Sequence, residues 1–191
     1  MSAKAEPPPD AAAAAFSLAC ALEKKGCEYA LGGAIALGYW GQPRGTVDVD
    51  LTVFLPPDRP YDLLHLLQEL SCEFSSSEAL KSLNQFGFCH VRHLGIRVDV
   101  FLPTVAFYEE ARKRRRRVAL EDAHVMVWSP EVLAVFKMMF FREKDHLDLK
   151  KILQVQGSTL DRSWIRGRLE DIFGKRDVRV TRWDELCSEV P

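Results

Sequence analysis

The segment that most constrains the fold is VDVDLTVFLP, at residues 47–56. Its side chains alternate in type and the run ends in prolines, which is typical of a β-strand with one buried face. Asp48 and Asp50 then lie on the same face, about 6.6 Å apart at a rise of ~3.3 Å per residue. The residues between and after them point the other way into apolar surroundings. The strand therefore carries two like charges side by side, which calls for a physical explanation.

A second segment, IRVDVF, repeats the pattern and places Asp99 where an apolar residue is expected. If the two strands are neighbours, Asp48, Asp50 and Asp99 converge. Carboxylates this close repel one another, and a bound cation removes that cost. Mg²⁺ is typically held by a few carboxylates together with substrate phosphates. The alternative is that all three acids are solvent-facing residues of an amphipathic sheet.

A glycine pair, Gly32 and Gly33, ends the apolar run CEYAL and opens the segment AIALGYWG, which has helical spacing. Glycine allows a positive φ and lets a phosphate approach the backbone closely. The free N–H groups of the following helix N-terminus favour an anion. The pair therefore predicts a phosphate cradle opposite the acidic strand. The alternative is a tight turn that needs glycine for steric reasons alone.

Composition excludes several classes of protein. A net charge of -1 gives no global field that would attract a nucleic acid or a membrane, so any basic surface must be local. The five cysteines form no CxxC pair, which argues against a zinc knuckle or a disulfide scaffold. No signal peptide is evident, and no apolar run approaches the ~20 residues that span a bilayer. We therefore expect a soluble, cytoplasmic protein that does not engage membranes.

The chain divides into three parts by pattern. Residues 1–9 are small, polar and proline-rich, and we expect a disordered tail there. Residues 10–128 read as an α/β core, and residues 129–191 as a helical segment packed on that core. Within the core, FGFCHVRHLGIRVDVFLP predicts a hairpin with Gly95 at its turn. His90 and His93 face opposite sides of its first strand, so we interpret them as ordinary residues rather than metal ligands.

The remaining elements follow from periodicity and capping residues. VMVW indicates one more strand. We expect helices in the segment AAAAAFSLACALEKKG after the N-cap Asp10, in YDLLHLLQEL, over residues 105–117, in SPEVLAVFKMMFF after the N-cap Ser129, in KDHLDLKKILQVQG and in DRSWIRGRLEDIFG.

The segment LGGAIALGYWGQPRGTVDVDLTVF resembles the signature of the polymerase-beta-like nucleotidyltransferase superfamily. Its ending, with Arg44, Thr46, Asp48 and Asp50, is similar to the minimal bacterial nucleotidyltransferases, which include toxin-like enzymes of abortive-infection (type IV toxin–antitoxin) systems. The resemblance implies the nucleotidyltransferase fold, a mixed twisted sheet of the α/β (α+β) class flanked by helices. It also implies that Gly32, Gly33, Arg44 and Thr46 bind a nucleotide.

The helical half adds to this resemblance. SPEVLAVFKMMFFREKDHLDLKKIL is similar to the subgroup's helical segment, which implies that Lys137 contacts the nucleotide phosphates and that Asp145 supports the active centre. Arg142, Lys144 and Asp148 would lie nearby. The alternative for Lys137 is an alkyl stem that carries its ammonium group to the surface.

The resemblance implies a magnesium-dependent transfer of a nucleoside monophosphate from a nucleoside triphosphate to a hydroxyl of RNA, a protein or a small molecule. Asp48, Asp50 and Asp99 would hold two Mg²⁺ ions. The basic run Arg112–Arg117 is a candidate RNA-binding (tRNA-binding) surface, with a solvated helix end as the alternative. An antitoxin or other partner protein is also implied. The competing hypotheses are a catalytically silent module of the same fold and a purely structural domain.

Overall fold

The computed structural model describes residues 10–121 and 123–190, so the tail expected at residues 1–9 lies outside the described residues. In chain order the elements are α1 (Ala11–Lys24), β1 (Tyr29–Leu31), α2 (Gly33–Trp40), β2 (Asp48–Val53), α3 (Pro60–Glu69), α4 (Ser76–Phe86), β3 (Phe88–His93), β4 (Ile96–Phe101), α5 (Phe107–Lys113), β5 (Arg116–Leu120), β6 (Ala123–Val127), α6 (Pro130–Phe140), α7 (Glu143–Gln156), the 3₁₀ turn η1 (Gly157–Thr159), α8 (Arg162–Phe173) and α9 (Val178–Glu189). None of the helices in these ranges is both long and apolar enough to cross a bilayer.

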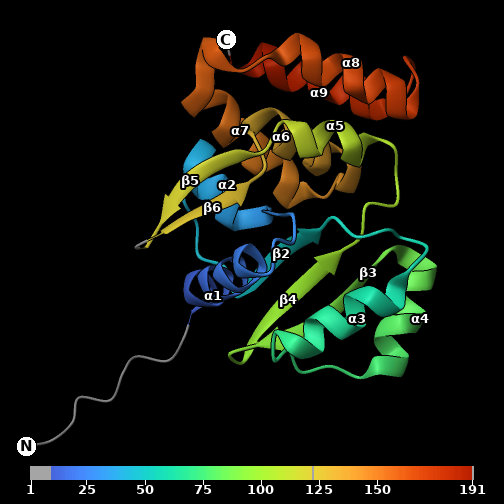
Figure 1. The fold of residues 1–191 in the computed structure, drawn as a ribbon. Helices are drawn as coiled ribbons and strands as arrows, with labels where there is room; N and C mark the ends of the chain where they lie inside the picture. Colours follow the sequence, from blue (N-terminus) through green and yellow to red (C-terminus); the bar gives the residue numbers. More distant parts are fainter. Residues whose placement is uncertain (1–9, 122, 191) are drawn as a thin grey trace, which may run out of the picture.

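The strands form one mixed sheet in the order β3-β4-β2-β1-β6-β5. β2 pairs with β4 in parallel, as β1 does with β6, whereas the other three pairings are antiparallel. Figure 1 shows the strands between helices, with α1 beside the sheet and the C-terminal helices gathered at the opposite end. This architecture confirms the predicted mixed α/β sheet flanked by helices.

Local sequence explains where the main elements begin and end. The Asp10 side chain accepts a hydrogen bond from the backbone N–H of Ala13 and caps α1, as predicted. Ser129 caps α6 in the same way, with Pro130 at the first helical position. The hairpin of β3 and β4 turns at Leu94 and Gly95, which both have positive φ. Such a two-residue turn matches the twist of the flanking strands.

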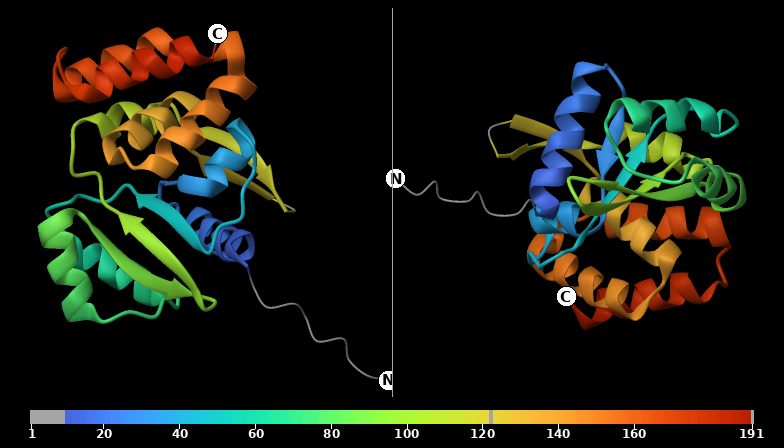
Figure 2. Two further views of the ribbon diagram at one scale, coloured as in Figure 1. Left: turned by 180° about the vertical axis from the view of Figure 1, so that it is seen from behind. Right: turned by 90° about the horizontal axis from the view of Figure 1, so that it is seen from below.

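The core lies on both faces of the sheet. On one face, α1 packs against β1, β2 and β6, and it covers the buried residues Val49, Leu51 and Val53. On the other face, α2 packs against β2 and also contacts α6 and α7. The two views in Figure 2 show the C-terminal helices stacked on this second face. The acidic face of β2 is therefore turned toward α2, α6 and α7, while its apolar face is sealed by α1. The division of the chain at residue 128 stays a prediction.

Three features differ from the expectations. The helix expected over residues 105–117 ends at Lys113, and Arg116 and Arg117 begin strand β5. β5 is an edge strand of the sheet, where charged side chains reach solvent and discourage further pairing. The helices α4 and α9 were not predicted. For α4 the signal was present, because Ser75 caps the helix by accepting from the N–H of Glu78, the Ser-x-x-Glu pattern of a helix start.

Candidate active site

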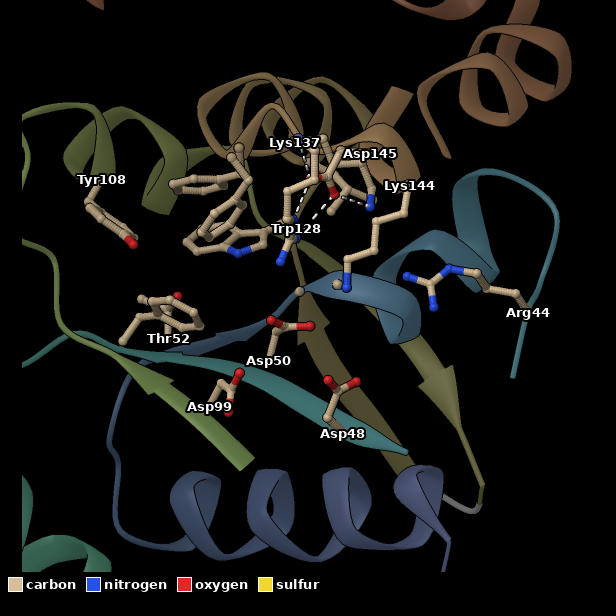
Figure 3. A pocket seen from close by; sticks show the side chains of 17 residues that line it. Arg44, Asp48, Asp50, Thr52, Asp99, Tyr108, Trp128, Lys137, Lys144 and Asp145 are labelled. Carbon is tan, nitrogen blue, oxygen red and sulfur yellow. Dashed lines mark hydrogen bonds and ion pairs between the residues drawn. The ribbon is translucent and has the colours of Figure 1, made fainter. Parts of the chain in front are cut away.

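Two parallel strands bring the predicted carboxylates together. In the register of β2 and β4, Asp50 lies directly opposite Asp99, and Asp48 precedes Asp50 on the same face. All three line one pocket, whose empty space including its open mouth is about 730 Å³. Figure 3 shows the three side chains rising from the sheet toward a shared space. The predicted convergence of the two acidic strands is confirmed by this register.

The central carboxylate, Asp50, is held in an unfavourable electrostatic environment. Burial raises the pKa of Asp50, the charges of Asp48 and Asp99 raise it further, and Lys137 and Arg142 oppose them only in part, so that its pKa rises from 3.8 to about 6. A group with this environment favours either a proton or a cation at its oxygen atoms. Such a poised carboxylate in a pocket is a hallmark of functional sites.

The two outer carboxylates are held in place by neighbours. The hydroxyl of Thr46 donates to Asp48 Oδ1 at 2.6 Å, and Thr46 itself does not line the pocket. His90 Nδ1 and Arg97 Nε lie 2.7 and 2.8 Å from Asp99 Oδ1. The contacts of His90 and Arg97 with Asp99 were not anticipated from the sequence. Thr46 is thus positioned to orient Asp48, and its role in binding a nucleotide stays a prediction.

The glycine pair is needed for two different reasons. Gly33 has a φ of +50°, and a Cβ at this position would overlap the carboxylate of Asp50. A Cβ at Gly32 would lie 3.2 Å from the indole of Trp128. Both glycines line the pocket, Gly33 at the N-terminus of α2. The positive φ expected for the pair is found at Gly33, where the absent side chain makes room for the carboxylate of Asp50.

A buried cluster of opposite charges forms the wall that α6 and α7 contribute. Lys137, only 4% exposed, donates to Asp148 Oδ2 at 2.7 Å and lies 3.7 Å from Asp145. Arg44 reaches the same Asp148 from the loop before β2, at 3.2 Å. Arg142 pairs with Asp145 at 2.7 Å, and Asp145 also accepts from the Arg142 backbone N–H. Lys137 is therefore buried in an ion-pair network instead of reaching the surface along its stem.

Asp148 is the hub of this cluster. Its burial alone would raise its pKa, but the hydrogen bonds and charges of Lys137 and Arg44 outweigh burial, and the pKa of Asp148 is lowered. Lys144, the next cation along α7, lines the pocket and forms no ion pair within the described ranges. Four cations thus face the carboxylates, and in Figure 3 Lys144 and Arg44 lie on the side of Asp48.

The opposite side of the pocket is aromatic. Its wall is made by Thr52, Tyr108, Trp128 and Phe136, each no more than 8% exposed. Tyr108 and Trp128 both pack against Phe136, with ring centroids 5.1 and 5.2 Å apart. Figure 3 shows Tyr108 and Thr52 at the far side of Asp50 from Arg44. This aromatic wall was not predicted, because its members come from β2, α5, β6–α6 and α6.

The donor set fits Mg²⁺. Among the residues that the structure describes, no three His, Cys, Asp or Glu side chains are arranged to enclose a metal ion by themselves. Mg²⁺ does not need such a cage, because it keeps several waters and is usually held by one or two carboxylates together with substrate phosphates. Burial and the charges of Asp48 and Asp99 raise the pKa of Asp50 despite the nearby cations, so a cation at its oxygen atoms would relieve this cost. Asp48 and Asp50 are the residues that could hold the ion, with Asp99 beside them.

The basic run Arg112–Arg117 does not form one surface. Arg112 pairs with Glu28, Arg115 donates to the carbonyl of Tyr29 at 2.9 Å, and Arg114 stacks on Trp164 at 4.0 Å. Three of the arginines are therefore engaged in contacts within the fold. Those on β5 are exposed.

Comparison with known proteins gives the fold a name. No protein-family model and no curated protein sequence matches the chain. The solution structure of the antibiotic-resistance factor ANT(2'')-Ia is similar, with a TM-score of 0.58, 14% identity, and 85% of this chain and 92% of that chain covered. ANT(2'')-Ia in complex with adenylyl-2''-tobramycin gives a TM-score of 0.61 at 12% identity, covering 85% and 98%. The lincomycin-bound lincosamide antibiotic adenylyltransferase LnuA gives 0.52 at 13%, covering 74% and 95%. The chain therefore has the fold of these nucleotidyltransferases.

Proposed function

We propose that the protein is a Mg²⁺-dependent nucleotidyltransferase that transfers a nucleoside monophosphate from a nucleoside triphosphate to an acceptor hydroxyl. The observation that carries this proposal is the facing of Asp50 and Asp99 across two parallel strands, in one pocket with four cations. Carboxylates hold Mg²⁺, and cations neutralise a triphosphate. The similarity of the fold to adenylyltransferases supports the same reading.

The residues of the pocket divide the work. Asp48 and Asp50 would hold Mg²⁺, which neutralises phosphate charge and polarises the phosphoryl group when bound. Asp99 lies beside them as the base that accepts the proton of the acceptor hydroxyl. That oxygen forms a bond to the α-phosphorus as the bond to the bridging oxygen breaks, and pyrophosphate leaves toward the cations. Catalysis of this kind is mostly positioning and charge neutralisation.

We assign the side of the pocket that carries Arg44, Lys137 and Lys144 to the pyrophosphate leaving group. Lys144 has no anionic partner in the described ranges, and Lys137 and Arg44 are held rigidly by Asp148. Gly32 and Gly33, which line the pocket at the start of α2, would receive the phosphates. The finer parts of the proposal are a toxin-like role, an antitoxin partner and an acceptor hydroxyl on RNA (tRNA among them), a protein or a small molecule. They rest on the resemblance of the motifs, and Arg116 and Arg117 are the arginines of the basic run best exposed for RNA.

The test is transfer of label. The protein is incubated with each of the four α-labelled nucleoside triphosphates, Mg²⁺ and three acceptor pools: total RNA, the protein itself and hydroxylated small molecules. We expect transfer with at least one pair, and a loss of at least about 100-fold in Asp48→Ala/Asp50→Ala. Asp58→Ala, an exposed acid in a turn, is the matched control. The absence of both transfer and Mg²⁺-dependent nucleotide binding would refute the proposal that the protein is a nucleotidyltransferase. Transfer that survives the double substitution would refute the assignment of Asp48 and Asp50 to the site.

A further inference from the structure

The two central strands give the pocket a direction. Because alternate residues share a face, β2 and β4 carry three successive pairs on the same side: Asp48 with Arg97, Asp50 with Asp99, and Thr52 with Phe101. All of them except Arg97 line the pocket. In Figure 3, Asp48 lies toward Arg44, and Thr52 lies on the side of Tyr108. The pocket is therefore charged at the Asp48 end of the strands and largely apolar at the Thr52 end. Asp50 and Asp99 lie between these two ends.

In-line transfer assigns an occupant to each end. The attacking oxygen and the leaving oxygen lie on opposite sides of the phosphorus in such a displacement. If pyrophosphate leaves toward Arg44 and Lys144, the acceptor hydroxyl must arrive from the side of Thr52 and Phe101. Asp99 is two residues before Phe101 on the same face of β4, so the base and the aromatic surface are adjacent. The aromatic end is thus the side from which the acceptor reaches the α-phosphorus.

The chemistry of this end is neutral and flat. Burial raises the pKa of Tyr108 to about 12, which keeps its phenol uncharged at any physiological pH. Thr52 supplies one further hydroxyl, and Trp128 and Phe136 supply aromatic side chains. At the mouth, Phe101 and Phe140 meet edge to face with centroids 6.2 Å apart. This wall offers stacking and two hydroxyls, but it offers no carboxylate to a polycation.

We propose that the end formed by Thr52, Phe101, Tyr108, Trp128 and Phe136 is the acceptor subsite, and that it takes an uncharged small molecule whose hydroxyl is carried on or beside an aromatic ring. This rests on the proposed nucleotidyl transfer and names its acceptor class. It distinguishes the protein from an enzyme for a polyamine acceptor, which would need anionic side chains at this wall in addition to the metal-binding acids.

Binding is measured first, because it does not depend on turnover. Tyrosol, which has a neutral ring and two hydroxyls, is titrated into the full chain by calorimetry and by saturation-transfer NMR, with and without Mg²⁺ and nucleotide. We expect saturable binding that Phe101→Leu weakens about five- to tenfold through the lost stacking. Thr52→Val, which keeps the shape of the side chain, should weaken binding without unfolding the wall. Tyr61→Leu, an exposed aromatic on α3, is the matched control and should leave binding unchanged.

Transfer is then compared among tyrosol, tobramycin and glycerol as acceptors. We expect tyrosol to be labelled with a KM that rises in Phe101→Leu, while the dissociation constant of the nucleotide changes less than twofold. Three results overturn the proposal: no tyrosol binding, preference for tobramycin or glycerol, or a tenfold weaker nucleotide affinity in Phe101→Leu, which would make this end the nucleobase site. Binding of tyrosol without transfer to it, while an acceptor from another pool is labelled, would refute the acceptor assignment and leave the proposed function standing. No transfer to any acceptor, together with no Mg²⁺-dependent nucleotide binding, would refute the proposed function itself.

Discussion

The substitution Asp50→Asn tests whether the charge of Asp50 destabilises the ligand-free fold. An acid whose pKa is higher in the folded than in the unfolded chain binds more protons when folded, so stability falls as pH rises through that range. For Asp50 the range runs from 3.8 to about 6. At about 1.4 kcal/mol for each pH unit, the full penalty above pH 6 is about 3 kcal/mol. Because Asp50 is partly open to the pocket, solvent reduces it, and we expect about 2 kcal/mol.

The assay is denaturant and thermal unfolding in EDTA at pH 4 and pH 8. The amide has nearly the shape of the carboxylate and does not ionise, so Asp50→Asn should be about 2 kcal/mol more stable than wild type at pH 8 and nearly equal to it at pH 4. For a chain of this length that corresponds to about 4–8 °C in Tm. Asp58→Asn, an exposed acid, should show no such gain at either pH.

Ligand should reverse the order of stability. With Mg²⁺ and nucleoside triphosphate at about 100 times their dissociation constant, wild type should gain about 2.7 kcal/mol, and Asp50→Asn should gain far less. The reasoning is refuted if Asp50→Asn is no more stable than wild type at pH 8 in EDTA, because burial and repulsion would then not act on this group. Equal gains in the two proteins would instead show that Asp50 does not hold the ion.

Two further substitutions probe the wall and the glycine turn. Asp148→Asn leaves the buried Lys137 without its closest counterion and should cost about 3–5 kcal/mol in urea unfolding. Wild type should also lose stability in acid below pH 4, because a lowered pKa stabilises the fold only while Asp148 is ionised. A loss under about 1 kcal/mol in Asp148→Asn would contradict the central role of Asp148 in the cluster. Gly33→Ala forces a side chain into a φ of +50° and against Asp50, so we expect at least about 1 kcal/mol of destabilisation and a loss of nucleotidyl transfer. Gly38→Ala, whose side chain would enter open space within α2, is the control and should stabilise the fold slightly. Similar thermal unfolding of the two variants would contradict the steric explanation.

Part of the site followed from local sequence. The alternation of β2 placed its acids on one face, and the two-residue turn after β3 also determines the hairpin register. With His93 opposite Ile96, counting back puts His90 opposite Asp99. The contact of His90 with the third carboxylate was therefore deducible, although the histidine was interpreted as an ordinary residue. The two-residue turn alone determines which residues of β3 and β4 face each other, without any contact between segments distant in the sequence.

The other half of the site depends on long-range pairing. Asp50 meets Asp99 only because two helices and a hairpin strand intervene and return β4 parallel to β2, and nothing local determines that register. The pairing of Lys137 with Asp148 likewise depends on the sharp turn between α6 and α7, where Phe141 has a φ of +56°. A positive φ at a phenylalanine is not foreseeable from composition.

The glycine pair shows how a local sequence feature and a long-range contact combine at the site. From the sequence, a glycine before a helix suggests room for phosphate, but the atom that first fills this room is the Asp50 carboxylate. The missing side chain lets Asp50 press against the backbone, and this close packing removes water from the carboxylate and contributes to its raised pKa. Gly33 and Asp50 therefore act together: the absence of a side chain at Gly33 permits the burial of Asp50, and this burial favours a cation at the Asp50 carboxylate. A larger residue at position 33 would push Asp50 toward solvent, lower its pKa and weaken the demand for metal at the point where the phosphate must also bind.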